Sequence, residues 1–147
     1  MKNQIIFSAL LMIFSFQCFA QKSNNNENDD RTWPGFFKML QTAVKSGDKN
    51  KITSLCDFTA MTKEDFNENY EYFFLGDAKK SFAKAKQNDA EKAKPEIEGL
   101  ANATEFYQLT FSYKEKDEDG EVEESELIYY IAKIKGRFRI VYLEAAG

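Results

Sequence analysis

The hydrophobic positions of the chain change their period part-way along it. Before residue 104 they recur every three or four residues, which is typical of amphipathic helices. A first helix is predicted to begin near Thr32 and to end at Ser46-Gly47-Asp48. Asp48 is then expected to cap a short second helix. The predicted buried side chains of these two helices are Phe36, Phe37, Leu40, Val44, Ile52, Leu55 and Cys56.

Two further helices follow from the same spacing. Thr62 and Asp65 form a variant of the capping box, with Asp in the place usually taken by Glu. The helix that they open presents one apolar face and ends at Gly76. Another helix is predicted from Ala78 to Lys86 or beyond, with Phe82 as its large apolar residue. The polar stretch 87–98 is expected to be a loop or a frayed helix end. The apolar face of the third helix consists of Phe66, Tyr70, Phe73 and Phe74.

From about Thr104 the period becomes two, which indicates half-buried strands. The predicted strands are residues 104–113, 122–134 and 137–143, and Lys135-Gly136 is a tight turn between the last two. The segment 127–131 is apolar on both faces, so the second strand is expected to be central in the sheet. In the last strand, Phe138, Ile140 and Tyr142 are predicted to share one face, and Val141 and Leu143 the other. The predicted fold class is α+β, with the N-terminal helices packed on one side of a curved antiparallel β-meander.

The beginning of the chain has the pattern of an export signal. Residues 1–20 combine a cationic start, an apolar run and a small-x-small ending, which predicts a signal peptide cleaved before Gln21. The apolar run is too short for a stable membrane span. Residues 21–31 contain no apolar side chain and are predicted to be a flexible tether, followed by a single α+β domain over residues 32–147. The expected location is secreted or periplasmic, and lipid attachment at Cys18 is the alternative.

Composition excludes several classes of function. The chain has a formal net charge of −4 and no dense basic stripe, so we expect no binding to nucleic acid. It contains no His, which excludes Ser-His-Asp and Cys-His catalysis and His-ligated zinc. An enzyme would have to use carboxylate, Tyr or Lys side chains. Cys56 follows Leu55 in an apolar patch and is predicted to be a buried thiol rather than a nucleophile.

The order of these elements resembles that of small exported proteins of Bacteroidetes-type bacteria. The similar segments are Phe36-Phe37-Lys38, the polar run 45–49, the capping segment 62–66 and the hairpin 133–138. The resemblance implies a cystatin-like or nuclear-transport-factor-2-like cone fold. Enzymes of that fold superfamily typically use an Asp–His pair in the cone, and a chain without His lacks that chemistry.

Two groups of side chains are candidate binding sites. Tyr and Trp suit half-open pockets because they have apolar bodies and polar tips, and the candidates for ligand binding are Trp33, Tyr107, Tyr113 and Tyr129. The acidic run 115–126 matches the oxygen spacing of a calcium loop, with Glu115, Asp117, Asp119 and Glu126 as candidate ligands. Glu at the first position and strands on both sides argue against it, so the preferred interpretation is an acidic hairpin without a metal.

These observations favour a non-catalytic binding or interaction module of the bacterial cell envelope. Its partner would be an unidentified small molecule or envelope protein, and no cofactor is expected. One alternative is a small enzyme that uses carboxylate or Tyr groups in a cone-shaped cavity. The other is an adhesion-type module weakly stabilised by calcium.

Overall fold

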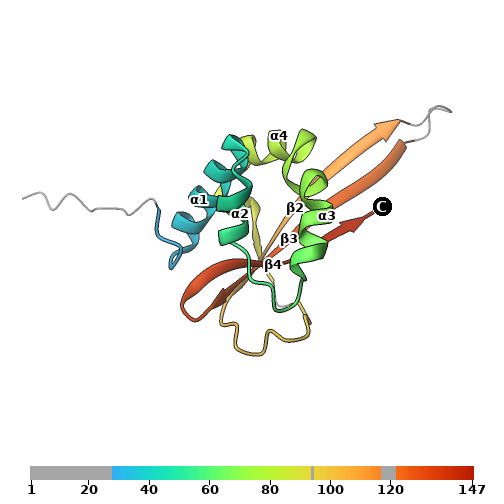
Figure 1. Ribbon diagram of the computed structural model, residues 1–147. Helices are drawn as coiled ribbons and strands as arrows, with labels where there is room; N and C mark the ends of the chain where they lie inside the picture. Colours follow the sequence, from blue (N-terminus) through green and yellow to red (C-terminus); the bar gives the residue numbers. More distant parts are fainter. Residues whose placement is uncertain (1–27, 94, 117–121) are drawn as a thin grey trace, which may run out of the picture.

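In the computed structural model, which describes residues 28–93, 95–116 and 122–147, four α-helices cover one face of a four-stranded antiparallel sheet (Figure 1). The α+β class is therefore confirmed. No helix within these described ranges is both long and apolar enough to cross a membrane. The helices are α1 (Trp33–Ser46), α2 (Lys49–Ser54), α3 (Lys63–Phe74) and α4 (Gly76–Lys84), followed by the 3₁₀ turn η1 (Gln87–Asp89). The strands are β1 (Glu91–Lys92), β2 (Phe106–Lys116), β3 (Val122–Ile134) and β4 (Arg137–Ala146).

Local capping signals place the helix ends as predicted. The Thr32 hydroxyl accepts a hydrogen bond from the Gly35 amide, and Asp48 accepts one from the Lys51 amide. Thr62 and Asp65 form the complete capping box at the start of α3. The fourth helix is shorter than predicted: it ends at Lys84, because the next residue is already extended.

The sheet has the order β1-β2-β3-β4, so β3 is an inner strand, as its apolar pattern predicted. Lys135 and Gly136 both have positive φ, the conformation of a tight hairpin turn. The short strand β1 was not predicted, since it is polar and only two residues long. It pairs through its backbone with Gln108 and Tyr107.

The predicted faces of β4 were wrong beyond Ile140. The register of β4 against β3 shifts by one residue there: Ile131 lies opposite Ile140, but Tyr130 lies opposite Tyr142. This bulge places Val141 and Tyr142 together on the face away from the helices. Leu143 consequently packs on the helix side.

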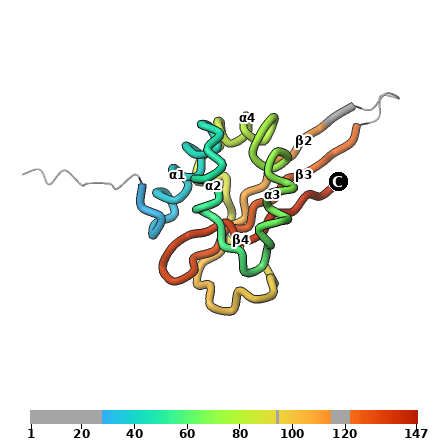
Figure 2. Tube along the Cα trace, viewed as in Figure 1, coloured from blue at the N-terminus to red at the C-terminus, as the bar shows by residue number. Residues whose placement is uncertain are grey.

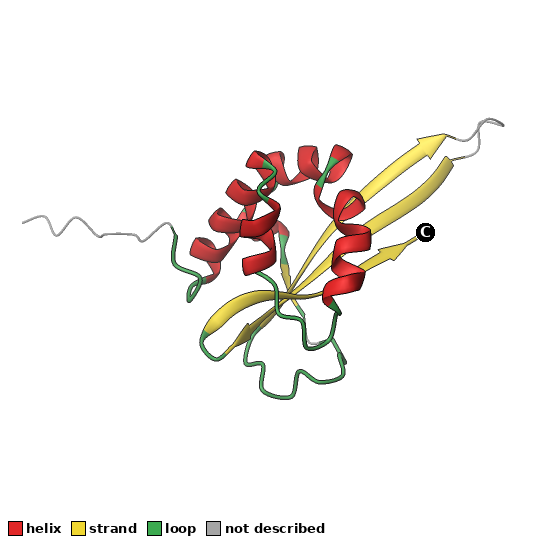
Figure 3. Ribbon diagram, in the orientation of Figure 1, coloured by secondary structure: helices red, strands yellow, loops and turns green. Residues whose placement is uncertain are grey.

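The helices and the sheet form two layers (Figure 3), and a ring-rich core fills the space between them. Its largest fully buried side chains come from both layers. A smaller cluster of Leu100, Ala132 and Val141 lies on the opposite face of the sheet, where the loop between β1 and β2 runs beneath the strands (Figure 2). The fully buried aromatic residues of the main core are Tyr129, Phe36, Phe66, Phe74, Phe82 and Phe138.

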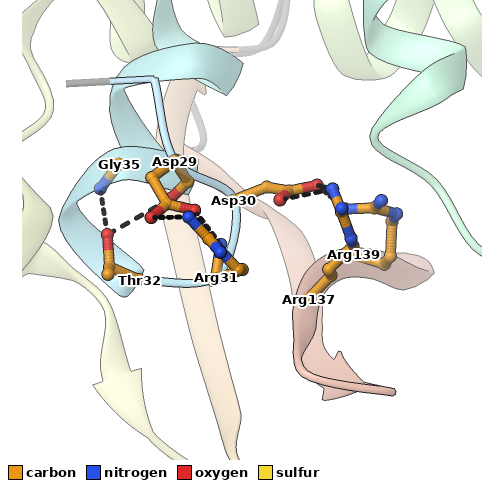
Figure 4. A network of polar contacts seen from close by, with 7 residues as sticks. All are labelled: Asp29, Asp30, Arg31, Thr32, Gly35, Arg137 and Arg139. Atoms are coloured by element: carbon orange, nitrogen blue, oxygen red, sulfur yellow. Dashed lines mark hydrogen bonds and ion pairs between the residues drawn. The ribbon is translucent and has the colours of Figure 1, made fainter. Parts of the chain in front are cut away.

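The predicted tether extended too far, because its last residues belong to the folded domain. Asp30 lies against β4, where its carboxylate binds Arg137 and Arg139 and its carbonyl oxygen accepts a hydrogen bond from the Phe138 amide (Figure 4). Sequence patterning missed this contact because it joins polar residues 107 and 109 positions apart. The predicted signal peptide and the rest of the tether, residues 1–27, lie outside the described residues.

Candidate functional site

The four predicted aromatic candidates lie between the helices and the sheet but do not converge on one site. Trp33, at the start of α1, stacks on Tyr107 of β2 with ring centroids 4.1 Å apart, and its ring nitrogen donates to the Gln87 carbonyl. Tyr129 is fully buried in the middle of β3, and its hydroxyl donates to the Phe73 carbonyl at 2.6 Å. Tyr113 lies farther along β2, near α4. Trp33, Tyr107 and Tyr129 thus contribute to core packing, whereas Tyr113 lines a cavity.

That cavity, of about 300 Å³, is lined by the end of α3, the start of α4 and the distal parts of β2 and β3. Leu75 is extended and Gly76 has a φ of 54°, so the chain turns sharply between the two helices. This turn brings the last turn of α3 and the first turn of α4 to the same opening. We call this space the junction cavity. Its lining consists of Glu71, Tyr72, Leu75, Gly76, Asp77, Ala78, Tyr113, Ser125 and Leu127.

Two tyrosines give the junction cavity its aromatic surface. The Tyr113 hydroxyl donates to the Ser81 hydroxyl oxygen at 3.1 Å, which fixes the ring. Burial raises the pKa of Tyr113, and the negative charge of Asp77 adds to that effect. Tyr72 is 55% exposed, and its ring meets the Phe73 ring edge-on. The hydrophobic pattern did not identify Tyr72, because this residue lies outside the apolar face of α3.

The charged side chains of the junction cavity are acidic. Glu71 is exposed on the last turn of α3, and Asp77 lies on the first turn of α4. The Lys80 ammonium pairs with the Asp77 carboxylate at 2.7 Å, and both side chains are largely exposed. Because one helix ends and another begins here, their terminal partial charges oppose each other. The side chains therefore determine the sign of the local potential.

A second depression lies on the opposite face of the sheet, beside the bulge in β4. Tyr130, Tyr142 and Glu144 form its strand side, and residues 95–98 form its loop side. The Tyr130 hydroxyl donates to the Glu144 carboxylate at 2.8 Å. The Glu144 carboxylate is therefore already hydrogen-bonded to a neighbouring side chain of the sheet.

Two of the four candidate calcium ligands lie on strands that the structure describes. Glu115 is in β2 and Glu126 in β3, whereas Asp117 and Asp119 lie outside the described residues. The Glu126 carboxylate accepts a hydrogen bond from the Ser112 hydroxyl across the strand pair. The flanking elements are strands, as predicted, whereas a calcium loop of the helix–loop–helix kind is flanked by helices. In the part of the chain described by the structure, no three acidic or thiol side chains gather as they would around a metal ion.

Cys56 is buried, as predicted, and the structure places it next to β4. Its thiol donates to the Ile52 carbonyl at 3.4 Å. Burial raises its pKa to about 12, so the thiolate is not populated at neutral pH. The side chain therefore acts as a small hydrophobic residue.

Comparison of the chain with protein-family models, with curated proteins and with solved structures finds no match. The cystatin-like or nuclear-transport-factor-2-like assignment therefore stays a prediction. The function has to be inferred from the geometry of the junction cavity and from the sequence.

Proposed function

We propose that the protein is exported and acts as a non-catalytic binding module of the bacterial cell envelope, with the junction cavity as its ligand site. The observation that supports this proposal is a cavity of about 300 Å³ that combines tyrosine rings, carboxylates and an apolar floor. Ligand sites commonly pair apolar walls with a few polar groups in this way. Helices on one face of an antiparallel sheet are also compatible with the cone fold that the resemblance implies.

The frame around the junction cavity favours binding by a preformed site. Ala78 and Leu127 are buried in the floor, and the Tyr113 ring is held by its hydrogen bond to Ser81. Side chains that are already ordered lose little conformational entropy when a ligand arrives. The site can therefore bind without a large rearrangement of the fold.

The polar groups of the cavity suit recognition better than proton transfer. Burial raises the pKa of Tyr113, so its hydroxyl stays protonated at neutral pH and acts through hydrogen bonds. A general base needs a pKa near the working pH. A binding module is therefore favoured over an enzyme that uses Tyr113 as its general base.

Ligand binding can be tested by recording amide NMR spectra of the purified protein during titration with methyl glucoside, acetate and choline. At least one of these probes is expected to shift the amides of residues 71–78, 113 and 125–127. Ser125→Trp fills the cavity and should abolish those shifts. Ser112→Trp is the matched control, because it introduces the same ring on the opposite face of the sheet. If no probe shifts these amides, the cavity is not the ligand site.

Export can be tested separately by cell fractionation and N-terminal sequencing. The mature protein is expected in the periplasm or the medium, with Gln21 as its first residue. A lipid-modified Cys18 at the N-terminus would show the membrane-anchored alternative. An intact leader on a cytosolic protein would contradict export.

A further inference from the structure

We propose that the junction cavity recognises an alkylated ammonium group, an inference that rests on the proposed ligand site. The described lining carries the carboxylates of Glu71 and Asp77 and the rings of Tyr72 and Tyr113, and it contains no Lys or Arg. Carboxylates attract a cation by charge, and aromatic rings attract it through their negative faces. Both features select the same class of ligand.

The carboxylates can exchange their present contacts for a ligand. Asp77 is paired with Lys80, but the two side chains are 62% and 75% exposed. Exposed ion pairs of this kind are weak, because water and salt screen them. Glu71 projects from the last turn of α3 and is likewise exposed. A cation that enters between the two helix ends therefore meets one carboxylate from each helix.

The tyrosine rings favour an ammonium ligand, and the carboxylates beside them repel an anion. The Tyr113 hydroxyl is hydrogen-bonded to the Ser81 hydroxyl at 3.1 Å, so its ring is held at the wall of the cavity. The Tyr72 ring is more than half exposed at the edge of the cavity and can lie against a ligand. Alkylated ammonium groups make few directional hydrogen bonds and bind to aromatic faces.

The apolar floor accounts for the alkyl groups. Leu75, Ala78 and Leu127 line the cavity together with the acidic and aromatic side chains. Their contact with methyl groups removes apolar surface from water on both partners. Small, strongly hydrated cations gain nothing from such a floor, which is why an alkylated ammonium fits better than a metal ion.

The decisive probes are choline and 3,3-dimethylbutan-1-ol. The second compound is the uncharged isostere of choline, in which carbon replaces the nitrogen. We expect choline to shift the amides of residues 71–78 and to bind at least about tenfold more tightly than the isostere. Raising the salt from about 20 mM to about 500 mM should weaken choline binding and leave the isostere unaffected, because salt screens the carboxylates.

Variants then identify the groups that bind the charge. Glu71→Gln is expected to weaken choline binding about threefold to tenfold, and Asp77→Asn provides a second test on the other helix. Glu64→Gln is the matched control, since it removes the same charge two turns earlier on α3. Tyr72→Leu should weaken binding, whereas Tyr72→Phe keeps the ring and should retain it. Unchanged amide dispersion in each variant shows that the fold is intact.

The outcomes separate this inference from the ligand site itself. If choline and its isostere bind equally, or if Glu71→Gln and Asp77→Asn both bind like the wild type, recognition of a cation is wrong. If methyl glucoside or acetate shifts the cavity amides and choline does not, the ligand site stands and the ammonium class falls. If choline shifts only amides around Tyr130 and Glu144, the depression on the opposite face binds it instead.

Discussion

The contact of Asp30 with β4 provides the sharpest test of how the N-terminal segment is held. Its side chain is 11% exposed and lies 2.7 Å from an Arg139 guanidinium nitrogen and 3.0 Å from one of Arg137. Asp30→Asn keeps the size of the side chain and the backbone hydrogen bond to Phe138, and removes the charge. The variant therefore isolates the ionic part of the contact.

The expected cost follows from the exposure of the two arginines. Arg137 is 59% exposed, so its pairing with Asp30 contributes little. Arg139 is 21% exposed and would be left beside a neutral amide. Hydrogen bonds to charged groups contribute about 1.5–3 kcal/mol, so we expect Asp30→Asn to lower the free energy of unfolding by about 2 kcal/mol.

The same contact predicts a pH dependence. Burial by itself raises the pKa of Asp30, but hydrogen bonds from Arg139 and Arg137, together with their charges, outweigh it and hold the pKa below its usual value. The ionised carboxylate therefore stabilises the folded state fully above pH about 4. That contribution is lost as the pH falls through the lowered pKa. The stability difference between wild type and Asp30→Asn should accordingly shrink in acid.

Urea unfolding at neutral pH and at pH about 3 measures both effects. Asp29→Asn is the control, because Asp29 pairs with Arg31, which is 65% exposed, and we expect a much smaller loss there. Equal stability of Asp30→Asn and wild type at neutral pH would refute the reasoning. So would a stability difference that stays constant down to pH about 3.

Four further results are expected. Gly35→Ala should destabilise the protein by about 2 kcal/mol or more in urea, because a Cβ there would lie 2.3 Å from the Asp29 carbonyl oxygen; a neutral result would show that the N-terminal segment is not held as described. Tyr129→Phe should cost about 1–2 kcal/mol, since it removes the buried hydrogen bond to Phe73; unchanged stability would contradict this. The Cys56 thiol should react with a thiol reagent at pH about 8 only as fast as the protein unfolds, because burial suppresses the thiolate, and immediate labelling would be inconsistent with burial. Melting curves with calcium and with chelator should coincide, and a higher Tm in calcium would restore the metal-stabilised alternative.

Much of the fold follows from local signals in the sequence. Thr32, Asp48 and the Thr62–Asp65 box place helix starts, because their side chains satisfy amides within the same turn. The alternation along 107–113 predicts the inward face of β2, and Lys135-Gly136 predicts the hairpin turn. These features depend on residues a few positions apart, so they can be predicted from the order of residues in the sequence.

The candidate site was predicted only in part, because its lining comes from separate elements. Tyr113 was identified as an aromatic that suits a pocket, and it lines the junction cavity. Glu71, Tyr72 and Asp77 were not identified, since each belongs to the polar side of its helix. Their proximity depends on the turn at Gly76 and on how the two helices pack against the sheet.

What the sequence by itself determined is therefore the type and order of the elements, which depend on short-range hydrogen bonds and on the period of apolar side chains. Tertiary structure decided the pairing of β1, the bulge opposite Tyr130, the contact of Asp30 with β4 and the lining of the junction cavity. Each of these depends on how separate elements of the chain pack against one another. Such arrangements form only when the core packs, so the spacing of hydrophobic residues along the chain does not predict them.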